Sequence, residues 1–433
     1  MRESIYQLFT GFAHGEANAE RRTPNAERRI RKAWRHHAPS WSFVACLCIV
    51  AVSNTAHAVV DLGIDVLEQS NYAILKGKRV GLVTNQTGAN RKGIRTRVLL
   101  RQNCNLVALY TPEHGLDGTE KAGKYVRSRK DRQTGVMAYS LYGPTRKPTR
   151  DMLRGVDVLV FDIQDIGCRG YTYISTMGKC MEAAGESNIP FVVLDRPNPL
   201  GGNRIEGPSV EGRWISFVSA FPVPYVHGMT VGELAKMVNA KGWAGAHCDL
   251  TVVPMRGWSR DMLWGDTLLR WIPPSPNIPR VDSVFGYVVT GTLGELSGVD
   301  TGVGGRAPFE SVSATGVNAQ TFTRNLNSLG LSGIQFRPLS RGRSQGCYFS
   351  MARNPETNLT AVGVYMLAEI NRASRNSIFR KSSRSKLDLF FKVYGSASIR
   401  SEMERGVSPS RIVASWRDNE ARFRAARAPY LLY

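Results

Sequence analysis

Short apolar runs that end in polar residues recur along the first two thirds of the chain. The run at residues 158–163 has the length and the β-branched content of a strand that is buried on both faces. Similar runs lie at residues 78–86, 104–114, 190–196 and 250–255. Segments with helical spacing separate the runs, at residues 94–102, 175–187 and 229–239. This alternation predicts an α/β fold with a doubly wound, mostly parallel sheet.

The pattern changes beyond residue 285. A glycine-rich segment comes first, followed by a strand and two helices, at residues 291–310, 334–337, 361–373 and 408–426. This order predicts a second, smaller α/β domain. We therefore divide the chain into an N-terminal extension (1–58), a larger domain with the doubly wound sheet (59–285) and a C-terminal α/β domain (286–433).

The first 58 residues have the features of a secretion signal. A basic run at 28–35 precedes an apolar stretch at 42–52, which has the length of a signal-peptide core and is too short to span a membrane. Ala-His-Ala at 56–58 fits a cleavage site. We expect an exported protein, periplasmic or secreted, without a stable membrane span.

The chain is strongly basic, with a formal net charge of +22. A basic surface favours anionic partners, but the Lys and Arg residues are scattered and no zinc-finger, RRM or KH signature is present, so nucleic acid is not expected. The glycine-rich segment lacks both the Gly-Lys-Ser/Thr of a phosphate loop and a strand–GxGxxG–helix fingerprint, which argues against a bound nucleotide. Beyond residue 58 the histidines are His114, His227 and His247, and no metal-binding helix motif is present, so we expect neither a metal nor another cofactor.

Polar residues stand where the apolar runs end. The candidates at or just beyond these ends are Asn85, Glu113, His114, Asp162, Gln164, Asp165, Arg169, Tyr171, Tyr173 and Asn198. In open parallel sheets, ligands bind outside the carboxyl ends of the strands. Turn and capping chemistry is the alternative, and it explains the Asn and Asp residues well but Glu113, His114 and Arg169 poorly. The strand ends therefore predict one wall of a ligand site.

Three further residues are candidates on weaker grounds. His227 stands just before the helix at 229–239, where it either faces the site or has a structural role. Glu295 and Arg306 are ionisable residues of the glycine-rich segment that could face a ligand. Glu233, by contrast, follows Thr230 by three residues, which is the spacing of a capping box, so we assign it a structural role.

Carboxylates surrounded by amides, guanidinium groups and phenols are typical active-site side chains of a glycosidase. In such enzymes one carboxylic acid protonates the leaving oxygen, and a second carboxylate or a group of the substrate supports the oxocarbenium ion. Glu113 is the best candidate for the acid because it follows a predicted strand and stands beside His114. Asp165 is our candidate for the second group. Asp162, Glu295 and a substrate group are alternatives, so the stereochemical course stays open.

Ordered motifs across the chain carry a family resemblance. They are Thr-Asn-Gln-Thr-Gly (84–88), Thr-Pro-Glu-His-Gly (111–115), Phe-Asp-Ile-Gln-Asp-Ile-Gly (161–167), Tyr-Thr-Tyr (171–173), Asp-Arg-Pro-Asn-Pro (195–199), His-Gly-Met-Thr (227–230), Ser-Pro-Asn (275–277), Pro-Phe-Glu (308–310) and Tyr-Leu-Leu-Tyr (430–433). From about residue 63 to the end, the chain resembles the exo-β-N-acetylmuramidases of the NamZ type. The resemblance implies a Rossmann-like domain joined to a smaller α/β domain, with the cleft between them.

The resemblance also implies a reaction and a partner. The family releases N-acetylmuramic acid from the non-reducing end of peptidoglycan fragments, so the expected substrates are muramyl saccharides derived from peptidoglycan. The Glu of the Pro-Glu-His-Gly motif is Glu113, which the resemblance makes the catalytic acid. Muramic acid carries a lactyl carboxylate, which Arg169 or Arg306 could bind bidentately. Nothing in the sequence fixes the oligomeric state.

The chain departs from the family pattern at three places. Lys124 stands where the family has an acidic residue. Residues 295–298 and 302–305 are Glu-Leu-Ser-Gly and Gly-Val-Gly-Gly in place of Glu-Gly-Thr-Asn and Gly-Arg-Gly-Thr. These changes motivate a second hypothesis, a catalytically decayed cell-wall glycan-binding protein that binds muropeptides without hydrolysis. A third hypothesis, a nucleotide-binding α/β enzyme, suffers from the missing phosphate loop.

Overall fold

The computed structural model describes residues 59–375 and 377–433. The predicted secretion signal at 1–58 lies outside the described residues. The described residues belong to one compact unit, Ala56–Tyr433, and the predicted domain boundary at residue 285 stays a prediction. A large, mainly parallel sheet precedes a smaller C-terminal region along the chain, which confirms the expected α/β class.

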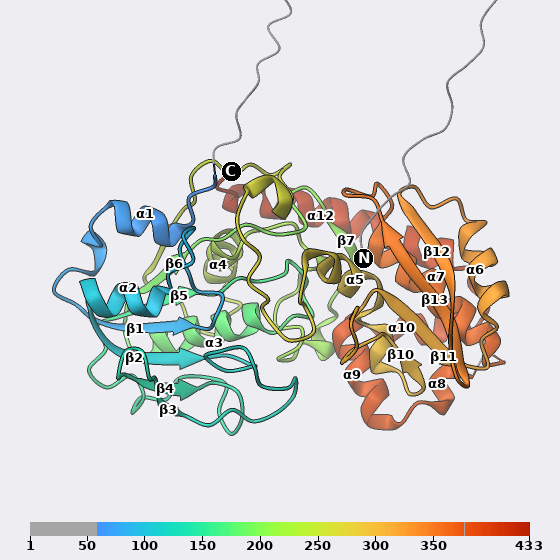
Figure 1. Cartoon of the computed structure of the whole chain (residues 1–433), viewed down its shortest axis with the longest axis horizontal. Helices are drawn as coiled ribbons and strands as arrows, with labels where there is room; N and C mark the ends of the chain where they lie inside the picture. Colours follow the sequence, from blue (N-terminus) through green and yellow to red (C-terminus); the bar gives the residue numbers. More distant parts are fainter. Residues whose placement is uncertain (1–58, 376) are drawn as a thin grey trace, which may run out of the picture. The chain divides into compact units, whose positions relative to one another are not determined.

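The large sheet has seven strands in the order β3-β4-β2-β1-β5-β6-β9 (Figure 1). They are β1 (Arg79–Thr84), β2 (Asn105–Thr111), β3 (Arg129–Lys130), β4 (Met137–Ser140), β5 (Val158–Asp162), β6 (Phe191–Leu194) and β9 (Leu250–Val253). Every neighbouring pair is parallel except β3 with β4. The chain moves outward from β1 to β2 and β4, and then returns to β5 on the other side of β1. The topological switch point, where ligands bind in such sheets, therefore lies between β1 and β5.

Helices connect these strands and make up much of the C-terminal region. They are α1 (Gly63–Gln69), α2 (Thr96–Asn103), α3 (Tyr173–Glu186), α4 (Val231–Ala240), α5 (Val281–Thr290), α6 (Ala319–Asn327), α7 (Leu359–Ala373), α8 (Ile378–Lys381), α9 (Arg384–Tyr394), α10 (Ser398–Glu404), α11 (Pro409–Ala414) and α12 (Arg417–Arg427). The predicted helix at 408–426 is thus two helices. A tighter turn separates them, in which the Trp416 N–H donates to the Val413 carbonyl at 3.2 Å.

Both faces of the large sheet are covered. Val158 and Val160 of β5 belong to a buried cluster that includes side chains of α1 and α2. Leu159 and Phe161 point the other way, into a cluster with side chains of α3 and α4. Because β5 is buried on both sides, it needs apolar residues almost without interruption, and this is why its sequence is a continuous apolar run.

The C-terminal region holds an antiparallel sheet in the order β10-β11-β13-β12. Its strands are β10 (Val299–Asp300), β11 (Ser311–Thr315), β12 (Ile334–Arg341) and β13 (Ser344–Met351). A separate antiparallel pair consists of β7 (Glu206–Ser209) and β8 (Pro224–Val226). The sequence predicts only the start of β12. The other strands are short or carry many Ser and Gly residues, so their apolar signal is weak.

The predicted capping box at the start of α4 is present. The Thr230 hydroxyl accepts a hydrogen bond from the Glu233 N–H at 3.2 Å, and the Glu233 carboxylate accepts one from the Thr230 N–H at 3.1 Å. Arg260 also donates to this carboxylate at 2.8 Å. Glu233 is fully buried in these contacts, which confirms its structural role.

Candidate active site

Glu113 lies just beyond the end of β2, next to the switch point, and is half-buried. Its Oε1 accepts a hydrogen bond from the Gly123 N–H at 2.7 Å, and its Oε2 accepts one from the Thr172 hydroxyl at 2.8 Å. Burial, with the Glu113 carboxylate beside it, raises the pKa of the Tyr142 phenol well above its usual value. Tyr142 therefore stays protonated and can donate toward Glu113. The carboxyl group is held in one orientation at the sheet edge.

Three tyrosines surround this carboxyl group. The ring of Tyr171 packs edge-on against Tyr173 at 4.8 Å and against Tyr287 at 5.9 Å between centroids. The Tyr173 hydroxyl donates to the Pro274 carbonyl at 2.5 Å. Burial raises the pKa of all three phenols, and the charge of Glu113 adds to each shift. The structure thus brings the predicted Tyr171 and Tyr173 together with Glu113 and adds Tyr287, which comes from α5.

Glu295 lies near the same tyrosines. It ends a short turn, Leu293–Glu295, and is half-buried. Burial raises its pKa, and Lys386 acts in the opposite direction. Its charge, like that of Glu113, raises the pKa of Tyr287. The structure therefore brings two carboxyl groups into the surroundings of one phenol, one from each of the two predicted domains.

Asn85 and His114 are buried at the same sheet edge. The side-chain Oδ1 of Asn85 accepts hydrogen bonds from the N–H of Thr87 at 2.8 Å and from its hydroxyl at 2.5 Å. The Asn85 side chain also lies beside Tyr173, where it partly offsets the rise in the Tyr173 pKa that burial causes. His114 adopts a left-handed backbone with φ of 67°, and its Nδ1 lies 2.7 Å from the Glu120 carbonyl oxygen. Asn85 therefore borders the tyrosines, whereas His114 shapes the loop that carries Gly123.

Asp162 and Arg169 are engaged by the protein itself. Asp162 is fully buried; one oxygen pairs with Nε of Arg196 at 2.5 Å and the other accepts from the Thr96 hydroxyl at 2.5 Å. The Arg169 guanidinium is also fully buried, and its donors bond to Ser219 Oγ and to the carbonyls of Pro208, Val223, Val393 and Tyr394. Since all five of its N–H donors are used, Arg169 has none left for a lactyl carboxylate. The geometry does not support ligand contacts by either residue.

Asn198 and Arg306 also differ from expectation. The Asn198 amide accepts from the Leu200 N–H at 3.0 Å and donates to the Met229 carbonyl at 3.0 Å, so it closes a turn. Arg306 is exposed in the loop before β11, and no contact places it near Glu113. The predicted ligand contacts of these two residues have no support in the geometry.

Asp165, Gln164 and His227 are buried polar residues that each keep one atom without a hydrogen-bond partner among the described residues. Asp165 accepts from the Gly167 N–H at 2.7 Å through one oxygen, and burial raises its pKa to about 7. Burial, with Arg427 and Arg169 nearby, lowers the pKa of His227 to about 3, so its ring is neutral. Gln164 donates to the carbonyls of Asp165 and Pro197, which leaves its Oε1 free.

Within residues 59–375 and 377–433, no helix is long and apolar enough to cross a membrane. No group of three or more His, Cys, Asp or Glu residues in the same part is arranged to hold a metal ion.

The chain matches known proteins over most of its length. Residues 80–282 match the family model of the N-terminal region of the exo-β-N-acetylmuramidase NamZ, and residues 285–433 match that of its C-terminal region. The peptidoglycan β-N-acetylmuramidase NamZ of Bacillus subtilis (strain 168) is 42% identical over 385 residues, which cover 86% of this chain and 91% of that protein.

Solved structures of the same kind exist. A DUF1343 family protein from Bacteroides fragilis NCTC 9343 is 42% identical, with a TM-score of 0.80 over 86% of this chain and 99% of that one. A second DUF1343 family protein from the same organism is 29% identical, with a TM-score of 0.67 over 87% of this chain and 99% of that one. The chain is therefore similar to the NamZ protein over most of its sequence and to the two DUF1343 proteins in both sequence and fold.

Proposed function

Since the chain belongs to the NamZ family of exo-β-N-acetylmuramidases, we propose that it releases N-acetylmuramic acid from the non-reducing end of peptidoglycan fragments. By this membership the chain is a glycoside hydrolase. The observation that carries the finer proposal is the position of Glu113. Its half-buried carboxyl group stands at the sheet edge, oriented by two hydrogen bonds and surrounded by phenols.

Glu113 acts as the general acid. Its carboxyl proton passes to the glycosidic oxygen as the bond from that oxygen to the anomeric carbon breaks, and positive charge develops on the sugar ring. A water molecule then supplies the hydroxyl group to the anomeric carbon, and its proton returns to a carboxylate. The Gly123 N–H and the Thr172 hydroxyl keep Glu113 oriented through these steps, and the protonated phenols offer donors to sugar hydroxyl groups.

We assign the second carboxylate to Glu295 rather than to Asp165. Asp165 is buried and its side chain closes a turn on Gly167. Glu295 is half-buried, its carboxylate accepts no hydrogen bond from the described residues, and it shares the surroundings of Tyr287 with Glu113. A carboxylate without protein donors is available to a substrate or to a water molecule. Glu295 would support the positive charge of the sugar ring.

Export is part of the proposal, because peptidoglycan lies outside the cytoplasmic membrane. The basic run, the apolar stretch and the Ala-His-Ala site within residues 1–58 support it. N-terminal sequencing of the protein recovered from the producing cells tests it. A mature protein that begins at Val59 is the expected result, and an uncut N-terminus in the cytoplasm would contradict export.

The test of activity uses protein that begins at Val59 and a pair of chromogenic substrates. One is a β-N-acetylmuramide, and the other is the matching β-N-acetylglucosaminide, which lacks only the lactyl group. Release of the dye from the muramide alone is the expected result. Binding of the muramide without release would favour the second hypothesis, a decayed glycan-binding protein with an altered loop at residues 295–305.

A further inference from the structure

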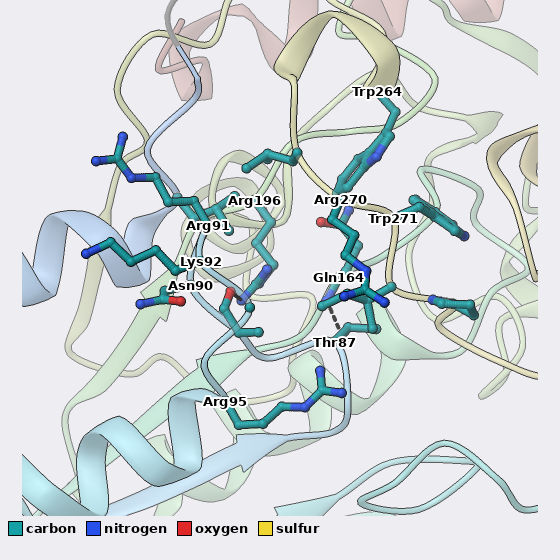
Figure 2. A pocket seen from close by; sticks show the side chains of 16 residues that line it. Thr87, Asn90, Arg91, Lys92, Arg95, Gln164, Arg196, Trp264, Arg270 and Trp271 are labelled. Carbon is teal, nitrogen blue, oxygen red and sulfur yellow. Dashed lines mark hydrogen bonds between the residues drawn. The ribbon is translucent and has the colours of Figure 1, made fainter.

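A cavity of about 300 Å³ opens at the carboxyl edge of the large sheet, beside the switch point. Segments just beyond β1, β5 and β6 supply Thr87, Gln164 and Arg196 to its wall. The rest of the wall comes from Leu62 just before α1, from the loop between β1 and α2, and from residues 264–273 after β9 (Figure 2). This volume is at the lower end of the range for small-molecule sites and suits a monosaccharide or a dipeptide.

The side chains that line this cavity include five cations and no carboxylate. Arg196 is neutralised by Asp162 at 2.5 Å. Arg95 and Arg270 have no carboxylate partner among the residues that the structure describes, and Arg95 donates only to the Gln86 carbonyl. Arg91 pairs with Asp61 at 2.7 Å, whereas Lys92, like Arg95 and Arg270, has no carboxylate partner in the described part of the chain. Three positive charges at the cavity are therefore uncompensated, and two of them are guanidinium groups.

The uncompensated guanidinium groups are close enough to repel one another. Burial lowers the pKa of Arg95, and the charges of Arg270 and Arg196 are among those that add to the effect. Figure 2 shows the side chains of Arg95 and Arg270 pointing toward Gln164. The side chains of Arg91 and Lys92 extend away from it. An anion placed between these groups would relieve the repulsion.

Two buried polar atoms at the cavity wall lack hydrogen-bond partners among the described residues, namely Gln164 Oε1 and Trp264 Nε1. Both side chains are more than nine-tenths buried, at 3% and 6% exposure. Buried polar atoms in native proteins are usually satisfied, so each of these points to a partner from outside the chain. Trp271, packed edge-on against Trp264 at 4.9 Å between centroids, adds an aromatic surface. The expected ligand thus carries an anionic group together with a hydroxyl or amide group.

The cavity is distinct from the Glu113 site but shares a wall with it. Pro273 lines the cavity, and the carbonyl of Pro274 accepts the hydrogen bond from Tyr173, which belongs to the Glu113 site. The side-chain amide of Gln86 donates hydrogen bonds to the carbonyl oxygens of Pro273 and Pro274, at 2.7 and 3.0 Å. One ligand that spans this wall could therefore occupy both places.

We propose that this cavity is an anion subsite, in which Arg95 and Arg270 bind a carboxylate of the peptidoglycan fragment while Gln164 and Trp264 bind a neighbouring hydroxyl or amide group. The proposal rests on the proposed function for the identity of the ligand. Guanidinium groups suit a carboxylate because the planar fork of one guanidinium can donate two parallel hydrogen bonds to its two oxygens. The carboxylate comes either from the lactyl group of muramic acid or from the stem peptide, and the experiment separates these sources.

The experiment is calorimetry at low salt, with four probes that the proposed reaction does not cleave. The probes are N-acetylmuramic acid, L-alanyl-D-glutamate, neutral N-acetylglucosamine and inorganic phosphate. The variants are Arg95→Gln and Arg270→Gln, both on the native chain and on Glu113→Gln. The control is Arg101→Gln, which removes the same charge from an exposed position of α2. Arg196 is left unchanged because its replacement would leave the buried carboxylate of Asp162 without its ion-pair partner.

One carboxylate probe should bind, and each cavity variant should weaken it about tenfold, whereas the control should not. A dependence seen with N-acetylmuramic acid identifies the lactyl group, and one seen with the dipeptide identifies the stem peptide. Equal affinity in all variants, or phosphate binding as tight as that of the carboxylates, would overturn the proposal. Binding is measured without turnover, so an inactive protein would refute the proposed function and leave this result standing.

Discussion

Glu113 and Asp165 stand beyond the ends of β2 and β5, on either side of β1, but their surroundings differ. Glu113 is half-buried, and each of its oxygens accepts a hydrogen bond. Asp165 is buried, with one oxygen bonded to the Gly167 N–H and the other without a partner among the described residues. A reactive carboxyl group must be reached by substrate, whereas a buried one mainly changes the energetics of folding. The two residues therefore call for different experiments.

Replacement of Glu113 by Gln should lower kcat by about 10² to 10⁴, because the amide cannot donate the proton that the leaving oxygen needs. The measurement is the steady-state rate on the chromogenic muramide. Glu120→Gln, an exposed change in the same loop, is the matched control and should keep its rate. Equal thermal unfolding of both variants excludes misfolding, and full activity of Glu113→Gln would remove this residue from the mechanism.

Asp165 should make stability depend on pH. Burial raises its pKa from 3.8 to about 7, so between these values the folded protein holds a proton that the unfolded chain releases. The free energy of unfolding therefore falls as the pH rises from about 4 to 7, and the contribution is complete only below about pH 4. Urea unfolding at pH 5 and pH 8 should show a loss of at least about 1 kcal/mol, since one pKa unit corresponds to about 1.4 kcal/mol.

The loss should shrink in Asp165→Asn, whose side chain does not ionise. Asp151→Asn, at an exposed position, should keep the full dependence on pH. Identical slopes for Asp165→Asn and the unchanged protein would show that another group is responsible.

At the scale of the element, helix starts are fixed by single side chains. Thr230 caps α4 with a buried hydroxyl, which also donates to Asp195 at 2.8 Å. Asn318 caps α6 at an exposed position and accepts one hydrogen bond, from the Thr321 N–H at 2.9 Å. Each side chain accepts a hydrogen bond from an N–H of the first helical turn, but only Thr230 also bonds to a buried residue, Asp195.

Thr230→Ala should therefore destabilise the protein by about 2 kcal/mol, and Asn318→Ala by about 1 kcal/mol or less. Chemical denaturation of both variants under one set of conditions makes the comparison. A larger loss for Asn318→Ala would mean that the bond from Thr230 to Asp195 contributes little.

Elements with strong periodicity could be predicted from the sequence, and others could not. The strands around β1 and β5 are continuous apolar runs, so their places are confirmed. The antiparallel strands β11 and β13 carry Ser and Gly at buried positions, and no run marks them. The capping box at Thr230 was visible because its two residues are local in sequence.

The site was predicted less completely, for a physical reason. Glu113, Tyr171 and Tyr173 follow strands, where polar residues stand out against the apolar runs. Tyr287 lies within an apolar helix, and Arg270 lies in a loop, so no local pattern marks either of them. Arg169 has the chemistry of a carboxylate ligand, but its partners are backbone carbonyls, which every sequence contains. Only the packing of distant segments decides such roles.

At the scale of the whole molecule, Arg169 joins segments that are far apart in sequence. Its guanidinium binds carbonyls of residues 208 and 223, and also those of residues 393 and 394 at the end of α9. Burial lowers its pKa to about 10, and it stays charged at neutral pH. A buried cation is tolerated here because every donor has an acceptor.

Arg169→Met should destabilise the protein by about 3 to 5 kcal/mol, because it leaves several buried acceptors without donors. Thermal unfolding measures the effect. Arg154→Met, at an exposed position, is the matched control and should change little. A small effect at Arg169 would mean that water takes over its hydrogen bonds.

The contacts of Arg169 also bear on whether the two regions of this protein can be separated in evolution. The two family regions meet near residue 283, and Arg169 lies in the first while Val393 and Tyr394 lie in the second. A gene fragment that encoded only the first region would produce a chain with a buried charge and two absent acceptors. We therefore expect the two regions to occur together in the same chain in related proteins. Neither region should be found alone or fused to an unrelated domain.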